Sequence, residues 1–314
     1  MYKIGVDLGG TNIAVGLVNE NAEIVVKKSL PTGAERPGEQ IVDDIATLCL
    51  GVCREAGIEK DQVESVGIAT PGIANNETGV VEYANNLPFR NFPIAALLKE
   101  KSGFENVHIA NDANAAAWGE AVAGAAKGSK NSVMITLGTG VGGGIIINEE
   151  IYCGFNHAGG ELGHIVIQVD GAPCSCGRRG CWEAYSSATA LIRMTREKIE
   201  ECRATGRPTI MTDKPKVSGR TACDAMRAGD EAGKEVYDKY IKYLASGLAT
   251  IINIFQPEVI SLGGGVSNEG QSLIDSLLPI VRKEQYGGDK VPLTEIRIAK
   301  LGNDAGIIGA AMLK

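Results

Sequence analysis

Hydrophobic and polar positions near the start of the chain alternate in the manner of β-strands. Three β-rich runs lie within residues 2–30, and the turns DLGGTN and NENAE separate them. We therefore predict a three-stranded meander at the start of the chain. The period changes in residues 37–57, where Ile41, Ile45 and Leu48 recur at helical spacing, and this segment predicts an amphipathic helix.

Strands and helices continue to alternate along the rest of the chain. Residues 106–126 predict a strand, a turn at Asn111 and Asp112, and then an alanine-rich helix. Two further segments, 63–72 and 257–267, each predict a strand that ends in a glycine-containing turn. We expect further helices in residues 92–103, 183–206, 230–256 and 301–314.

The plan of the first hairpin returns later in the chain. Residues 132–152 again read as strand, glycine turn, strand and Asn-Glu turn, with a Leu-Gly pair at the place it has in residues 2–24. Such a repeat predicts two related domains that face each other. We expect a small N-terminal α/β domain of residues 1–110 plus 303–314 and a large C-terminal α/β domain of residues 111–302.

Composition narrows the class of protein. A chain of 314 residues with 44% hydrophobic residues is long enough for two domains, and its net charge of −7 does not suggest a nucleic-acid partner. We expect no signal peptide, because only three residues precede the first strand pattern, and no membrane partner, because no stretch stays apolar long enough. Eight cysteines in such a length do not form a disulfide scaffold, so we predict a cytoplasmic protein in which the five scattered cysteines are buried hydrophobes.

Glycine-rich turns after strands suggest phosphate binding. Free backbone N–H groups without a Cβ allow the close approach that a phosphate needs, and the turns Gly9-Gly10-Thr11 and Gly138-Thr139-Gly140 both qualify. Asp7 ends the first strand, where a carboxylate can hold Mg²⁺. A third turn, Gly263-Gly264-Gly265, offers bare backbone to an adenine or a ribose. Each turn alone is typical of an ordinary hairpin, and the three together favour a nucleotide.

Two common nucleotide motifs are excluded. No Walker A pattern occurs in the chain. The string GTGVGG matches a Rossmann fingerprint, but the strand-like GIII follows it where a helix would be required.

A cysteine-rich segment predicts a metal site. His164, Cys174, Cys176 and Cys181 form the pattern H-x₉-C-x-C-x₄-C within the loop 164–183. One imidazole and three thiolates make a closed tetrahedral set for Zn²⁺, and such a set leaves no open position for substrate. The site is therefore expected to be structural, and free thiols, a strained disulfide or an Fe–S cluster are the alternatives.

The motifs, taken in order, resemble those of a known family. DLGGTN, NDANAAAWGE, LGTGVGGGI, GGELGH and CSCGRRGCWE are similar to those of the ROK family of sugar kinases and sugar-responsive repressors, and most of all to its bacterial zinc-containing glucokinases. The resemblance covers nearly the whole chain. It implies the two-domain sugar kinase, Hsp70 and actin fold, which is ribonuclease H-like and has a cleft between its domains.

The resemblance also assigns roles to particular residues. Asp112, which alone would be read as a helix N-cap, becomes the general base that takes the proton of the sugar 6-hydroxyl. It implies ATP, Mg²⁺ and structural Zn²⁺ as cofactors. The expected sugar contacts are Gly72, Asn86, Asn111, Asp112, Glu161, His164 and Glu183, with His157 as a weaker candidate. The expected ATP contacts are Asp7, Gly9, Gly10, Thr11, Asn12, Gly138, Thr139, Gly140, Gly263 and Gly264.

The resemblance points to ATP-dependent phosphorylation of D-glucose to glucose 6-phosphate, and alternatives stay open beside it. Kinases for fructose, mannose, allose or N-acetyl amino sugars such as N-acetylmannosamine share the fold, and one carboxylate can decide between sugars that differ by one hydroxyl. A sugar-responsive repressor is disfavoured, because such relatives carry an N-terminal helix-turn-helix and DLGGTN here begins at Asp7. By resemblance we expect a homodimer or homotetramer.

Overall fold

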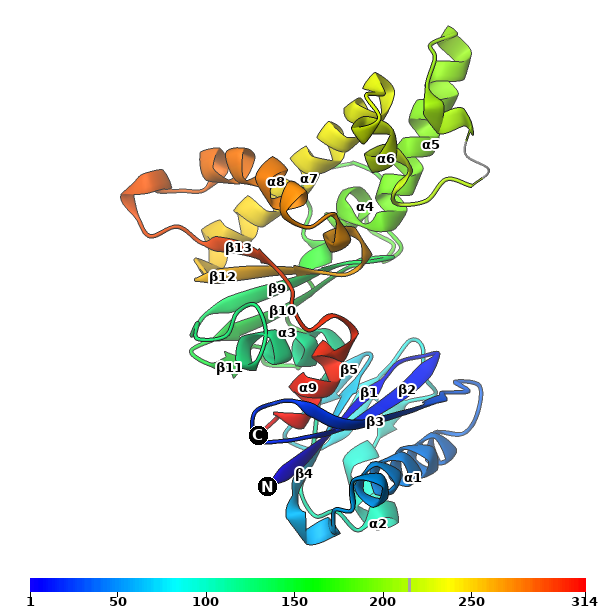
Figure 1. The fold of residues 1–314 in the computed structure, drawn as a ribbon, viewed down its shortest axis with the longest axis vertical. Coiled ribbons are helices and arrows are strands. Elements are labelled where there is room, and N and C mark those ends of the chain that lie inside the picture. Colours follow the sequence, from blue (N-terminus) through cyan, green and yellow to red (C-terminus); the bar gives the residue numbers. More distant parts are fainter. Residues whose placement is uncertain (214–215) are drawn as a thin grey trace. The chain divides into compact units, whose positions relative to one another are not determined.

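The fold was analysed in a computed structural model that describes residues 1–213 and 216–314 (Figure 1). By its internal contacts the chain divides into two compact units. Unit 1 holds residues 1–134, 144–160 and 299–314, and unit 2 holds residues 135–143 and 161–298. This division places residues 111–134 and 144–160 with the N-terminal part of the chain, whereas the sequence analysis expected them in the large C-terminal domain. The expected boundary between the two domains stays a prediction.

Unit 1 is built on a mixed five-stranded sheet in the order β3-β2-β1-β4-β8. β1, β2 and β3 form the expected antiparallel meander, whereas β4 and β8 continue the sheet in parallel. The strands are β1 (Tyr2–Leu8), β2 (Asn12–Val18), β3 (Ile24–Pro31), β4 (Val63–Thr70) and β8 (Val107–Asn111). A small sheet of β5 (Ile73–Asn75), β6 (Val80–Tyr83) and β7 (Arg90–Phe92) follows β4.

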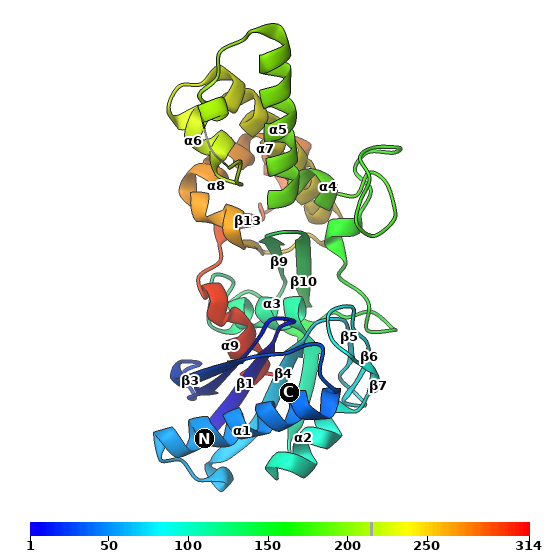
Figure 2. The same ribbon diagram turned by 90° about the vertical axis from the view of Figure 1, so that its right-hand side faces the viewer.

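Helices cover both faces of this first sheet (Figure 2). On one face lie α1 (Gly38–Ala56) and α2 (Ile94–Ser102), which bury the predicted apolar stripe of α1. On the other face lie α3 (Asp112–Val122) and α9 (Ala305–Ala311), which pack against each other. The Trp118 indole N–H donates to the Met312 carbonyl at 2.9 Å, and the fully buried Glu120 carboxylate accepts the Lys300 and Leu301 N–H groups. These bonds place α3 in unit 1.

The second five-stranded sheet repeats the order of the first, β11-β10-β9-β12-β13. This confirms the repeat seen in the sequence. Its strands are β9 (Ser132–Leu137), β10 (Val141–Ile147), β11 (Glu150–Ile151), β12 (Val259–Gly263) and β13 (Glu295–Ile298). The division between the units passes through β9 and β10, so that unit 2 holds the carboxyl end of β9, the start of β10, and the parallel pair β12 and β13.

The helices of unit 2 differ from expectation at residues 183–206, and two further helices, at residues 221–227 and 271–284, were not predicted. The segment 183–206, predicted as one helix, forms α4 (Glu183–Ser186) and α5 (Ala188–Thr205). The single helix was wrong because Ser187 adopts an extended conformation and caps α5, its side chain accepting the Ala190 N–H at 3.1 Å. The remaining helices are α6 (Thr221–Arg227), α7 (Glu231–Phe255) and α8 (Gln271–Glu284).

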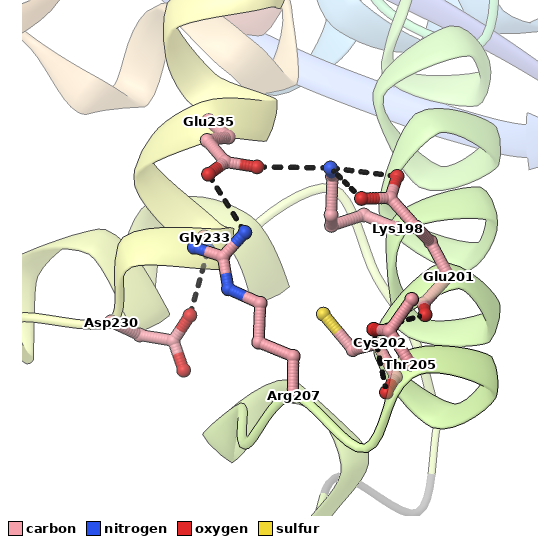
Figure 3. A network of polar contacts seen from close by, with 8 residues as sticks. All are labelled: Lys198, Glu201, Cys202, Thr205, Arg207, Asp230, Gly233 and Glu235. Atoms are coloured by element: carbon pink, nitrogen blue, oxygen red, sulfur yellow. Dashed lines mark hydrogen bonds and ion pairs between the residues drawn. The ribbon is translucent and has the colours of Figure 1, made fainter.

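A polar network joins α5 to α7 (Figure 3). The Lys198 ammonium on α5 contacts Glu201 at 2.7 Å and Glu235 of α7 at 2.9 Å, and Arg207 contacts the same Glu235 carboxylate at 2.8 Å. Each exposed pair contributes at most about 1 kcal/mol, but the shared carboxylate makes the contacts a network. The short helix α4 packs on both α5 and α7.

No helix in the described part of the chain is both long enough and apolar enough to cross a membrane.

Candidate functional site

Three neighbouring strands of unit 1 bring candidate residues to one edge of their sheet. β1, β4 and β8 are parallel, with Asp7 opposite Ala69 and Thr70 opposite Asn111. Their carboxyl ends therefore lie at the same edge, and Gly72 follows two residues after Thr70. Ligands of open α/β sheets bind at this edge. The structure thus brings together Asp7, Gly72 and Asn111, which the sequence places far apart.

Asn111, and not Asp112, caps helix α3. The Asn111 Oδ1 accepts the Ala113 N–H at 2.9 Å and the Asn114 N–H at 3.3 Å, while its Nδ2 donates to the Gly72 carbonyl at 3.1 Å. The N-cap position that the sequence allowed for Asp112 is therefore taken by its neighbour. Asp112 is the first residue of α3, where the helix dipole favours a carboxylate, and its Oδ1 also accepts the Ala113 N–H at 2.8 Å.

The Asp7 carboxyl group is half-buried and lies close to a second acid. Its pKa is raised from 3.8 to about 6, mainly by burial and also by the nearby Asp112 carboxylate, while the Lys27 charge opposes both effects. A carboxylate that is desolvated next to another carboxylate gains from a bound cation. The donor set at this edge therefore fits Mg²⁺, which prefers carboxylate oxygens.

We expect Asp7→Asn to stabilise the folded protein at neutral pH while it abolishes turnover. The folded-state pKa of about 6 lies above the ordinary 3.8, so the stabilisation by proton binding is present below about pH 4 and is lost as pH rises through 6. The neutral amide avoids this loss, and the free energy of unfolding at pH 7.5 should rise by about 2 kcal/mol. Urea denaturation at pH 5 and pH 7.5 measures it, and an unchanged pH dependence in the variant would contradict the assignment.

The turn between β1 and β2 is closed on itself. The Gly9 N–H donates to the Asn12 carbonyl at 2.9 Å, as the short DLGGTN turn requires. Asn86 lies beside this turn, because a methyl group placed on Gly10 would come 3.2 Å from its Cβ. The contact puts Asn86, an expected sugar ligand, next to the expected phosphate turn, and its role stays a prediction.

A cavity of about 460 Å³ opens within unit 1 behind Asn111. Its walls include Asn76, His108, Asn111, Asn114, Trp118 and Glu150. Asn114 is only 4% exposed and lines this cavity from helix α3. The sequence analysis missed Asn114, although its spacing of three from Asn111 places both on one helix face.

Two glycine turns of unit 2 also lie together. Gly264 follows β12 with a φ of +83°, and a Cβ there would lie 2.6 Å from the backbone of Leu137, the last residue of β9. Only glycine permits this approach. The turn Gly138-Thr139-Gly140 starts at the next residue, so the two turns expected to contact ATP are neighbours in unit 2.

The predicted metal ligands converge in the described chain. The ligand atoms of His164, Cys174, Cys176 and Cys181 all lie within 4.8 Å of one another. The Cys176 and Cys181 sulfurs are 3.7 Å apart, and the Cys174 sulfur is 3.7 Å from the His164 Nδ1. Thiolates at about 2.3 Å from a tetrahedral Zn²⁺ are about 3.8 Å apart, so the donor set fits zinc, and the cysteines are free of disulfides.

Tight backbone turns bring the cluster together. Gly180 has a φ of +77°, and a Cβ there would lie 1.7 Å from the Gln168 carbonyl oxygen. The Cys174 N–H donates to the Arg178 carbonyl at 2.9 Å, which closes the loop that carries the first two thiols. The fold of the metal loop therefore depends on glycine at position 180.

The thiols differ in acidity. The pKa of Cys176 is lowered, first by the backbone N–H of Arg178 and only last by the Arg178 charge. Burial raises the pKa of Cys181 to about 12, and zinc binding would therefore have to displace a proton there.

Glu183 joins the metal loop to the glycine turn of unit 2. Its Oε1 accepts hydrogen bonds from the Ser175 hydroxyl at 3.0 Å and from the Cys174 thiol at 3.6 Å. Its Oε2 accepts the Val141 N–H at 3.0 Å, just after Gly140. The preceding Trp182 is fully buried and donates to the Tyr243 carbonyl of α7 at 3.0 Å. The position of Glu183 therefore depends on both the loop and α7.

The remaining candidate residues, His157 and Glu161, precede the short helical turn Leu162–His164. Glu161 is exposed and directly precedes the turn that carries His164. His157 lies in unit 1, with its Nδ1 3.7 Å from the Cys153 sulfur. Cys153 is half-buried, which corrects its assignment as a buried hydrophobe, whereas the other four scattered cysteines are buried as expected. The candidate residues thus form one group in each unit.

Comparisons with known proteins agree with these motifs. The ROK family model matches residues 3–314. The glucokinase of Streptomyces coelicolor is 37% identical over 99% of this chain and 96% of its own length. The glucokinase of Halalkalibacterium halodurans is 38% identical over 99% of this chain and 94% of its own length.

A solved structure is similar in both sequence and fold. The crystal structure of a ROK family glucokinase from Streptomyces griseus in complex with glucose and AMPPNP is 34% identical, with a TM-score of 0.77 over 99% of this chain and 98% of that chain. The similarity runs through both units and includes the segments that carry the candidate residues. The chain therefore belongs to the ROK family.

Proposed function

We propose that this protein is an ATP-dependent glucokinase that converts D-glucose and ATP to glucose 6-phosphate and ADP. The observation that carries the proposal is the position of Asp112. It directly follows β8 at the carboxyl edge of the sheet, as the first residue of α3 and next to the N-cap residue Asn111. The proposed reaction and the proposed sugar are inferred from the glucokinases to which the chain is similar.

The proposed mechanism assigns one task to each group of residues. Asp112 takes the proton from the 6-hydroxyl of glucose, whose oxygen bonds to the γ-phosphorus as the bond to the bridging oxygen of ADP breaks. Asp7 would hold Mg²⁺, which neutralises charge on the phosphates when bound. The backbone N–H groups of the turns around Gly10 and Thr139 would bind phosphate oxygens, and Gly263 and Gly264 would lie against the nucleoside.

The sugar contacts in this mechanism come from both groups. Asn111 and Gly72 are already joined by a hydrogen bond at the edge of the first sheet. Glu161, His164 and Glu183 would accept from or donate to sugar hydroxyls, for which paired carboxylate oxygens are suited. The His164 Nδ1 faces the cluster, so its Nε2 is left for a hydroxyl.

Zinc has a structural task in this proposal. His164, Cys174, Cys176 and Cys181 would fill all four positions of Zn²⁺ and leave none for substrate. Free thiols and the need for ATP favour the cytoplasm as the place of action. Assembly as a homodimer or homotetramer stays an expectation from the family resemblance.

A sugar panel with ATP and Mg²⁺, read by ADP release, tests the proposed reaction. We expect glucose to give the highest kcat/KM, above mannose, fructose, allose and N-acetyl amino sugars, because a site built for particular hydroxyls rejects analogues that leave its buried polar groups unpaired. ADP release that is highest with an N-acetyl amino sugar would reassign the substrate. Absence of turnover with every sugar, together with sugar-dependent binding to DNA, would favour the repressor alternative.

A further inference from the structure

Thr32 is joined to the expected phosphate turn by two hydrogen bonds. It directly follows β3, and it is fully buried. Its hydroxyl donates to the Gly9 carbonyl at 2.6 Å, and its backbone N–H donates to the Thr11 carbonyl at 2.9 Å. One residue therefore holds the turn from both ends.

The bond to Gly9 also orients the next peptide group. The described chain has no cis peptide bonds, so the carbonyl of each residue and the N–H of the next point in opposite directions. Because the Thr32 hydroxyl holds the Gly9 carbonyl, the Gly10 N–H points away from Thr32. An N–H group that is fixed in this direction is a donor for an anion such as a phosphate.

Thr32 is itself held in place from α1. The Arg36 guanidinium donates to the Thr32 carbonyl at 2.7 Å and to the Asp44 carboxylate of α1 at 2.6 Å. Its Nε also donates to the Gly33 carbonyl at 3.3 Å. The segment after β3 is therefore anchored on the side away from the turn, and the Thr32 hydroxyl cannot follow Gly9 freely if the turn moves.

We propose that Thr32 is a positioning residue for the nucleotide phosphates. Its hydroxyl fixes the Gly9–Gly10 peptide so that the Gly10 N–H is ready to donate before the nucleotide arrives. This inference rests on the proposed function and assigns to Thr32 an effect on ATP and none on the sugar. The hydroxyl carries the effect, so serine can replace threonine and the isosteric valine cannot.

Thr32→Val and Thr32→Ser test the proposal in the full-length protein. We expect Thr32→Val to raise the KM for ATP about tenfold, the loss typical of a weakened hydrogen bond to a charged group, and to leave the Kd for glucose within about twofold. Thr32→Ser should restore the KM for ATP. Affinity for a non-hydrolysable ATP analogue, measured by calorimetry, checks the effect on binding without turnover.

Thr294→Val is the matched control. Thr294 is also buried, and its hydroxyl donates to the Pro257 carbonyl at 2.7 Å in unit 2, outside the three turns expected to contact ATP. Its loss should lower the Tm in the same way as Thr32→Val and leave the KM for ATP unchanged. If both valine variants raise the KM for ATP equally, or if neither does, the inference is wrong.

The test separates this inference from the proposed function. A wild-type protein that phosphorylates no sugar overturns the proposed function, and the calorimetric affinities of the two Thr32 variants still decide the role of the hydroxyl. A wild-type glucokinase whose Thr32→Val variant binds the ATP analogue normally overturns only the inference.

Discussion

Asp112→Asn is expected to fold and bind glucose normally while its kcat falls by a factor of about 10²–10⁴, the usual contribution of a positioned general base. The physical reason is the loss of the proton acceptor, since the amide has the same shape and cannot take the proton. The fold should survive because Asn111 is the N-cap of α3, and because an asparagine Oδ1 at position 112 can still accept the Ala113 N–H that the Asp112 Oδ1 accepts at 2.8 Å. Steady-state kinetics and glucose calorimetry on the same preparation measure the two effects separately.

A matched control uses another acid at a helix start. Asp230 caps α7 by accepting the Gly233 N–H at 2.8 Å, and asparagine caps helices equally well. Asp230→Asn should therefore leave kcat unchanged. Turnover at the wild-type level in Asp112→Asn would refute the assignment of the base. A loss of glucose binding in that variant would show that Asp112 acts mainly by binding the sugar.

Removal of the metal is expected to damage sugar binding far more than ATP binding. Cys176→Ser, or chelation of the wild-type protein, should raise the KM for glucose about tenfold or more, because residues that hold a binding side chain in place often have effects of this size. The KM for ATP should change by about twofold at most. The cause lies at Glu183, whose Oε1 accepts the Ser175 hydroxyl of the metal loop at 3.0 Å. Without the metal the loop no longer holds Ser175, and with it the carboxylate, at one place.

Zinc content, Tm and glucose affinity should be measured together for this prediction. Cys202→Ala is the control, because Cys202 is a buried cysteine of α5 outside the cluster. It should keep the zinc and the KM for glucose. Zinc-free protein that binds glucose normally but melts at a lower temperature would show that the loop serves stability alone.

Much of the local structure was predictable because it depends on neighbours in the sequence. The meander of β1, β2 and β3, the helix that begins after Asn111 and the repeat of the sheet order all follow from alternation, helical spacing and turn residues. The four metal ligands lie within 18 residues of one another, so their spacing alone limits what they can form. Geometry of this kind is local, so the order of the residues determines it.

The sequence did less well where one residue decides between two local structures. The cap of α3 is either Asn111 or Asp112, and the choice depends on which of the two has an extended backbone. The break between α4 and α5 likewise depends on the extended backbone of one residue, Ser187. Both alternatives have similar propensities, and the bonds of Asn111 to Gly72 and of Ser187 to Ala190 settle them.

Contacts between distant segments could not be read from the order of residues. The four metal ligands, the glycine turns and the fold class could be predicted from the sequence, because short motifs carry each of them. The raised pKa of Asp7, the place of Asn114 in the wall of a cavity and the bonds of Glu183 to Val141 and Ser175 became visible only in the folded chain. Burial and long-range hydrogen bonds arise when strands far apart in sequence are brought to one edge, and no local pattern encodes the neighbours that such an edge acquires.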